Sequence, residues 1–98
     1  MTVSVTFHRL AVRELIDAAQ YYDLEEGGLG DIFLREIERT LIHITEYPDA
    51  ARIVAGNVRR RLVRRFPYAV IYSVSKSDLR VLAVMNLKRR PFYWAGRS

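Results

Sequence analysis

The sequence of 98 residues contains no cysteine, so neither disulfide bonds nor thiolate metal sites can stabilise it. It also contains no apolar run near the roughly 20 residues that a membrane-spanning helix needs. Residues 1–10 lack the apolar stretch of a secretory signal. We therefore expect a soluble cytoplasmic protein with a single domain over residues 1–98, because half of the residues are hydrophobic and can form one core.

Acidic residues are scarce in the second half of the chain. Sixteen Lys and Arg residues outnumber eleven Asp and Glu residues, which gives a formal net charge of +5. Between Asn57 and Ser98 the only acidic residue is Asp78. Such a basic half predicts an anionic partner, and charge alone leaves open whether that partner is nucleic acid or an acidic protein segment.

Apolar periodicity predicts one strand and two helices in the first half. Val3, Val5 and Phe7 alternate with polar residues, which is typical of a short half-buried strand. The first helix ends at the glycine pair 27–28, and Pro48 stops the second near residue 47. The apolar stripes expected to pack in this antiparallel hairpin are Val12, Leu15, Ile16, Ala19 and Tyr22, and then Phe33, Ile37, Leu41 and Ile44.

The second half of the sequence predicts three successive strands. After a short extended piece at residues 52–55, they are expected over residues 58–66, 68–75 and 79–87. Residues 81–85 are apolar at every position, as expected of a central strand covered on both faces. The element order β-α-α-β-β-β predicts an α+β fold, with a mainly antiparallel sheet and an antiparallel helical hairpin packed on one face.

Six short strings of residues occur in a distinctive order along nearly the whole chain. They are residues 18–22 (AAQYY), 28–33 (GLGDIF), 47–48 (YP), 58–60 (VRR), 65–72 (RFPYAVIY) and 89–94 (RRPFYW). Together they resemble toxins of the RelE/ParE superfamily, especially the ParE-like and plasmid stabilisation branches. The resemblance implies a compact toxin that a small antitoxin encoded beside it neutralises. It also implies one of two targets, since some relatives cut mRNA in the ribosomal A site without a metal and others inhibit DNA gyrase.

The densest basic run lies between Arg59 and Arg65. Alternation along one strand sends Arg59, Arg61 and Arg65 to one face and Arg60 and Arg64 to the other, unless a bulge intervenes. Guanidinium groups in such a strand suit phosphates or an acidic partner. The alternative is a solvated edge strand whose charges discourage aggregation. We favour binding, because no acidic neighbour neutralises the run, and predict contacts by Arg59, Arg61, Arg64 and Arg65.

A second basic group, formed by Lys88, Arg89 and Arg90, follows the last predicted strand and precedes several aromatic residues. Cations beside aromatic rings can hold phosphates and stack bases. The rings can equally well cap the core, with Trp94 as a packing anchor. We predict that the three cations contact the target or the antitoxin and that the aromatic residues pack.

The residues available for chemistry disfavour a nuclease. Metal-independent cleavage of RNA needs a base, an acid and a cation near the phosphate. By the resemblance, cutting relatives carry Arg and His where this chain has Ala69 and Asn86, although Arg65 and Tyr93 could substitute. We therefore predict a ParE-like toxin that inhibits growth by binding DNA gyrase. The alternatives are a ribosome-dependent mRNA endoribonuclease and a non-toxic, antitoxin-binding remnant.

The remaining expectations concern ligands and partners. No cluster of acidic residues at metal-ligand spacing accompanies His8 or His43, so we expect both to lie at the surface or to cap a helix. We expect no metal and no cofactor. The apolar residues 81–85 beside unpaired arginines predict an acidic, amphipathic antitoxin segment that lays apolar side chains onto the sheet and orders on binding.

Overall fold

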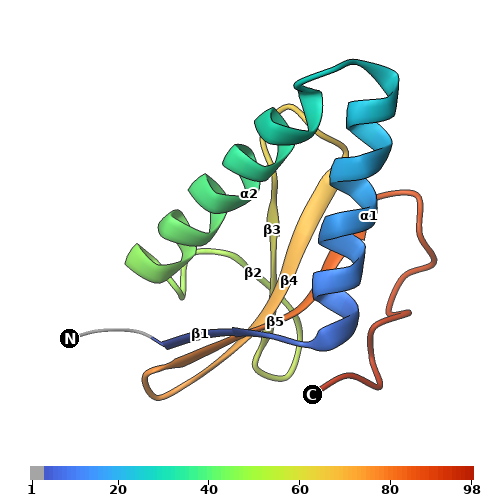
Figure 1. Cartoon of the computed structure of the whole chain (residues 1–98). Coiled ribbons are helices and arrows are strands. Elements are labelled where there is room, and N and C mark those ends of the chain that lie inside the picture. The colour runs from blue at the N-terminus through green and yellow to red at the C-terminus, as the bar shows by residue number, and fades with distance from the viewer. Residues whose placement is uncertain (1–3) are drawn as a thin grey trace.

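The helices and strands follow the predicted order along the chain (Figure 1). The computed structural model describes residues 4–98, so Val3 lies outside the described residues. The elements are β1 (Ser4–Phe7), α1 (Arg9–Glu25), α2 (Leu29–Glu46), β2 (Arg52–Ala55), β3 (Val58–Leu62), β4 (Tyr68–Ser75) and β5 (Asp78–Asn86). The strands have the order β1-β5-β4-β3-β2, and only the β1–β5 pair is parallel. The α+β fold with a mainly antiparallel sheet is thus confirmed.

Helix α1 begins directly after β1 because His8 caps it. The His8 Nδ1 atom accepts a hydrogen bond from the Leu10 backbone N–H at 3.0 Å. Such an acceptor satisfies one of the backbone donors that the first helical turn leaves without a partner. The expected capping role of His8 is confirmed, and His43 lies exposed near the end of α2, as expected.

The turn between the helices depends on two glycines. Gly28 has φ +89° directly before α2, a left-handed backbone that glycine adopts without steric cost. Gly30 donates its N–H to Asp23 Oδ1 at 2.7 Å. A Cβ atom at residue 30 would lie 2.5 Å from the Ala19 carbonyl oxygen, so any side chain there would push the helices apart.

Helix α1 turns a different face to the core from the one that its apolar stripe predicts. Ala11 and Ala18 are buried, whereas Val12 and Ile16 are 39% and 47% exposed. The prediction was therefore wrong for Val12 and Ile16, while the rest of the stripe packs partly buried against the core. The physical reason is that small alanine side chains let the helix lie close to β5, which turns the contact seam toward Ala11 and Ala18.

Helix α2 packs through its predicted stripe: Phe33, Ile37 and Ile44 are buried and Leu41 is partly buried. The Phe33 ring centroid lies 5.1 Å from that of Phe66 and 5.0 Å from that of Tyr68, with edge-on geometry. Aromatic pairs at such distances are favourable beyond the area that they bury. This cluster joins α2 to the loop after β3 and to the beginning of β4.

The C-terminal segment, residues 91–98, covers part of the sheet face that the helices leave open (Figure 1). Trp94 is only 5% exposed and packs in a second core cluster with Ile71, Leu82 and Ala83. Strand β5 is buried at every position from residue 81 to residue 85. The predicted coverage of this strand on both faces is confirmed, and Trp94 is the packing anchor.

Strand β3 ends at Leu62 and does not continue to Phe66, so the predicted strand was too long. The backbone turns after Leu62, and Arg65 adopts a positive φ of 72°. This turn allows the Phe66 ring to enter the core, where burial of an aromatic side chain is strongly favourable. As a consequence, Arg64 and Arg65 lie in an exposed turn, and their predicted alternation across the sheet was wrong.

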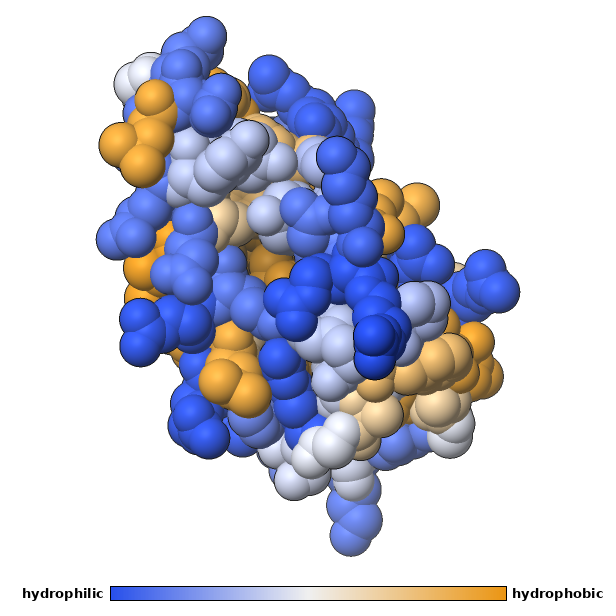
Figure 2. All heavy atoms as spheres, turned by 90° about the vertical axis from the view of Figure 1, so that its right-hand side faces the viewer, coloured by the Kyte–Doolittle hydropathy of each residue, from blue (hydrophilic) through white to orange (hydrophobic). Residues whose placement is uncertain are grey.

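The side of the molecule that carries α1 and the C-terminal segment is largely hydrophilic (Figure 2). Val12, Ile16 and Phe92 are among the exposed apolar side chains of the chain. Hydrophobic atoms appear on this side in scattered groups between hydrophilic ones. Within residues 4–98, neither helix is long and apolar enough to cross a membrane.

Candidate functional site

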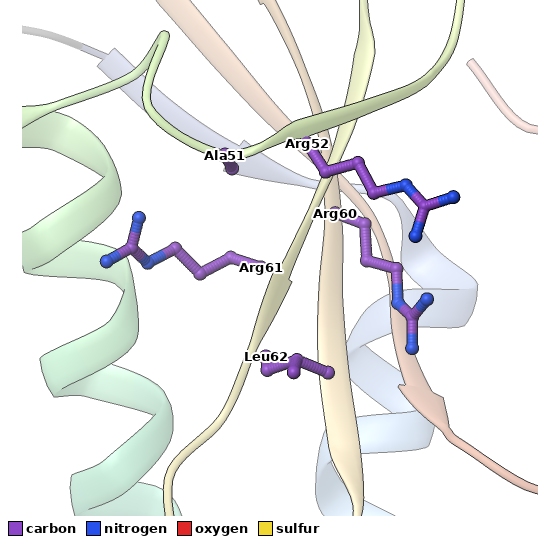
Figure 3. A pocket seen from close by; sticks show the side chains of 5 residues that line it. All are labelled: Ala51, Arg52, Arg60, Arg61 and Leu62. Atoms are coloured by element: carbon purple, nitrogen blue, oxygen red, sulfur yellow. The ribbon is translucent and has the colours of Figure 1, made fainter.

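Two arginines lie opposite each other on the edge strand β2 and its neighbour β3. The β2–β3 register pairs Arg52 with Arg60, and both side chains extend in the same direction, away from α2 (Figure 3). Directly opposed like charges destabilise a strand pair. Neither guanidinium forms an ion pair with any residue between 4 and 98. The pair is therefore available to an anion.

The hollow drawn in Figure 3, of about 380 Å³, is lined by Ala51, Arg52, Arg60, Arg61 and Leu62.

The same two arginines border a groove of about 220 Å³ that extends to the C-terminal segment. Its other lining residues are Val54, Ile71, Met85, Pro91, Phe92 and Trp94. Phe92 is 54% exposed, and its ring centroid lies 5.6 Å from that of Trp94. The groove, called the Arg52–Arg60 groove below, thus combines two cations with an apolar floor and an exposed aromatic ring.

Arg59, a predicted contact residue, is bound to the loop between α2 and β2. Its Nη1 atom donates hydrogen bonds to the carbonyl oxygens of Asp49 and Ala51 at 2.9 and 2.7 Å. The Asp49 carboxylate, 3.5 Å from Arg59 Nη2, is exposed, so this ion pair adds little stability. The Tyr72 hydroxyl donates to the Pro48 carbonyl oxygen of the same loop at 3.0 Å. Arg59 therefore positions the loop that leads into β2.

Arg61 and Arg64 belong to a surface beside α2. Arg61 points toward that helix, opposite to Arg60, so the predicted alternation is confirmed at these two positions (Figure 3). Arg61 and Arg64 border a cavity of about 150 Å³ together with Glu36 and Arg39. Glu36 is buried, and its Oε1 atom lies 4.0 Å from Arg39 Nε. This surface carries a carboxylate among its arginines, unlike the Arg52–Arg60 groove.

The other predicted contact residues lie in exposed turns. Arg65 lies between β3 and β4, and Lys88, Arg89 and Arg90 follow β5. The Arg89 guanidinium lies 4.0 Å from the centroid of the Tyr93 ring. Within residues 4–98, Arg65 and Tyr93 share neither a hydrogen bond nor a cation–π contact. The basic residues that the sequence groups together are thus spread over several surfaces.

Glu14 joins the C-terminal segment to the edge of β5. Its carboxylate accepts hydrogen bonds from the Val84 N–H at 3.0 Å and from the Tyr93 hydroxyl at 2.7 Å. Arg97 donates two hydrogen bonds to this carboxylate, at 2.9 and 3.1 Å, and one to the Leu82 carbonyl oxygen at 3.0 Å. The pairing of β1 with β5 ends before this point. The two side chains therefore satisfy backbone groups that no neighbouring strand reaches.

Sequence reasoning did not select Arg52 and Arg60 as candidate contact residues and missed the role of Glu14. A usable signal existed for Arg52, since it begins an extended piece that the turn at residues 56–57 folds back onto the arginine run. Glu14 gave no signal, because its partner Arg97 lies at the other end of the chain. Only the fold brings those two side chains together.

Tyr93 provides a test of this network at alkaline pH. Burial, followed by the hydrogen bond to Glu14, raises the pKa of Tyr93. A tyrosine whose pKa is raised by folding stabilises the folded state below the unfolded pKa of about 10, and that contribution is lost as the pH rises further. We therefore expect Tyr93→Phe to lose stability less steeply than the unmodified chain as the pH rises above about 10, when the free energy of unfolding is measured in urea at each pH. If the free energy of unfolding falls equally steeply with pH in the two proteins, the raised pKa of Tyr93 is contradicted.

Comparison with known proteins relates the chain to toxin–antitoxin systems by both sequence and fold. A family model described as ParE toxin of type II toxin-antitoxin system, parDE, matches residues 5–91. No curated protein sequence matches the chain. Among solved structures, the chain is similar to one titled chromosomal ParDE TA system from P. aeruginosa. That similarity has a TM-score of 0.64 at 15% sequence identity and covers 87% of this chain and 96% of the other. At this identity the structural likeness shows a shared fold.

Proposed function

The chain belongs to the ParE toxin family of type II toxin–antitoxin systems, and from this membership we propose that it inhibits growth by binding DNA gyrase. In this proposal the Arg52–Arg60 groove contacts the target, and a small antitoxin neutralises the toxin by occupying the groove. The toxin role follows from the family. The lining of the groove supports a target that is bound, as we propose for gyrase, over RNA that is cleaved.

The observation that carries the proposal is the composition of the groove. Its lining supplies two cations, apolar side chains and aromatic rings, and among residues 4–98 it includes no carboxylate, histidine or tyrosine. A nuclease would need such groups to transfer protons during cleavage of RNA. Binding requires only complementary charge and shape. The groove therefore suits a toxin that acts by contact.

Two further positions support binding over cleavage. Ala69 and Asn86 occupy the positions at which the resemblance places Arg and His in relatives that cut mRNA. Ala69 is buried. The Asn86 side chain accepts a hydrogen bond from the Lys88 N–H at 2.9 Å. Tyr93 could act in proton transfer, but its hydroxyl is bound to Glu14 and its raised pKa keeps it a neutral phenol. None of these groups is poised to take a proton from a nucleotide.

An acidic antitoxin segment suits the basic half of the chain. The apolar residues 81–85, which motivated docking on the sheet, are buried under the helices and the C-terminal segment. Exposed apolar side chains remain on β2, β3 and the C-terminal segment, at Ile53, Leu62 and Phe92. In this proposal the antitoxin places acidic groups on the arginines and apolar side chains on these three residues.

The purified chain should be added to gyrase with relaxed plasmid and, separately, to programmed ribosomes. We expect inhibition of supercoiling, because the groove binds its target, and an intact message. The product of the small reading frame encoded beside the chain should restore supercoiling. Message cut at the A site with supercoiling unaffected would overturn the proposal, and Arg65 and Tyr93 would then be the first residues to mutate.

A matched pair of double variants tests the role of the groove. Arg52→Gln/Arg60→Gln should weaken inhibition of supercoiling at least about tenfold, because both guanidiniums leave the interface. Arg13→Gln/Arg35→Gln removes the same charge from exposed positions of α1 and α2 and should inhibit like the unmodified chain. An equal loss in both variants would assign the effect to net charge and not to the groove.

A further inference from the structure

We propose that the Arg52–Arg60 groove binds single-stranded DNA, with a backbone phosphate between the two guanidiniums and a base stacked on Phe92. The inference rests on the proposed function, because it assigns a ligand to the same groove. It adds that the toxin contacts DNA held by its target as well as the target protein.

The arginine pair has the geometry of a phosphate site. Residues directly opposite in an antiparallel pair have Cβ atoms about 4.5–5.5 Å apart, so Arg52 and Arg60 can both reach one phosphate. Neither side chain donates a hydrogen bond to any group in residues 4–98, and Arg60 Nε is buried without a partner. A phosphate would accept hydrogen bonds from both guanidinium groups and would offset the repulsion between their charges.

The aromatic side of the groove distinguishes nucleic acid from an acidic peptide. Phe92 has a positive φ of 62°, which is uncommon for a bulky residue, and its ring is exposed beside Trp94. An acidic peptide would use the two cations, but its carboxylates gain nothing from an exposed ring. A base has such a planar face, and exposed aromatic rings beside cations are a common platform for single strands.

The other cationic surfaces lack this combination. Arg59 is hydrogen-bonded to the loop before β2, and the Arg61 surface includes the carboxylate of Glu36. Arg89 stacks on Tyr93. Among the described surfaces lined by arginines, only the Arg52–Arg60 groove combines two cations with no facing carboxylate and an exposed aromatic ring.

Fluorescence anisotropy with a labelled oligothymidine strand tests the inference on the intact chain. Arg52→Gln/Arg60→Gln should weaken binding at least about tenfold and should reduce the slope of log affinity against log salt by about 0.7, because the contact with one phosphate of a single strand is lost. Arg13→Gln/Arg35→Gln should keep the affinity within about twofold, since those exposed positions make no such contact. Equal losses in the two variants would overturn the inference.

A base-free strand isolates the stacking interaction. Phe92→Ala should weaken binding of oligothymidine about fivefold or more and should leave binding of an abasic strand of equal length unchanged. An equal effect on both strands would show that no base stacks on Phe92. Binding of a polyglutamate peptide at the groove without binding of either strand would assign the groove to an acidic protein segment and overturn the inference.

Gyrase assays separate this inference from the proposed function. If oligothymidine binds through Arg52 and Arg60 while gyrase is unaffected, the ligand assignment holds and the proposed target is wrong. If supercoiling is inhibited and no strand binds, the target holds and the ligand assignment is wrong. The melting temperature of each variant should be measured first, and we expect Arg52→Gln/Arg60→Gln to be as stable as the unmodified chain because it removes opposed like charges.

Discussion

Replacing Glu14 by alanine is expected to lower the free energy of unfolding by about 3 kcal/mol, because it breaks a buried ion pair by removing one partner. The side chains of Arg97 and Glu14 are only 11% and 15% exposed, so the guanidinium would remain largely buried without its carboxylate. The Val84 N–H and the Tyr93 hydroxyl would lose their acceptor as well. Urea unfolding at neutral pH measures the change.

Two controls define what this loss means. Glu38→Ala removes an exposed carboxylate from α2, and we expect it to change the free energy of unfolding by no more than about 0.5 kcal/mol. Glu14→Ala/Arg97→Ala removes both partners and should cost less than the sum of the two single variants, because no charge is left buried alone. A loss for Glu14→Ala as small as that for Glu38→Ala would show that the network contributes little.

The Glu14 network also supports the groove from a distance. Tyr93 and Arg97 bind Glu14, and Phe92 and Trp94 line the groove from the same C-terminal segment. If this segment loosens, the exposed ring no longer has a fixed place beside the arginines. We therefore expect the stability of the segment and the proposed binding at the groove to be coupled through Glu14 on α1.

The fold was predictable because the strongest patterns in the sequence agree with each other. The stripe of α2 is formed by large apolar residues with one clear face, and residues 81–85 are apolar on both sides of a strand. The inward face of helix α1 was harder to predict. Its small alanines and its larger valine and isoleucine lie on adjacent faces, and either face could pack against the sheet. Periodicity identifies an apolar stripe, but the packing distance between α1 and β5 decides which face of the helix is buried.

The sequence predicted a basic strand but not which of its arginines line the candidate site. A two-residue turn at residues 56–57 without any irregularity would pair Arg52 with Arg61. The structure instead has a register shift between Ile53 and Ala55, which pairs Arg52 with Arg60. One extra residue in β2 thus decides which arginines share a face, and no feature of the sequence indicates it.

Replacing Phe33 by alanine should lower the free energy of unfolding by about 3–5 kcal/mol, because it leaves a cavity where an aromatic ring is completely buried. The ring packs against Tyr22, Phe66 and Tyr68, which belong to three different segments, so no single neighbour can move to fill the space. A small domain has about 5–15 kcal/mol of stability in total. Urea unfolding followed by far-ultraviolet circular dichroism measures the loss.

Ile16→Ala is the matched control, since it removes a large apolar side chain from the neighbouring helix at a position that the structure exposes. Alanine also favours helix slightly more than isoleucine does, so the free energy of unfolding should stay within about 0.5 kcal/mol. Similar losses for the two variants would place Ile16 in the core and restore the face of α1 that its apolar stripe predicts. A large loss for Phe33→Ala alone would support the rotated helix, with its alanines against β5 and its isoleucine in solvent.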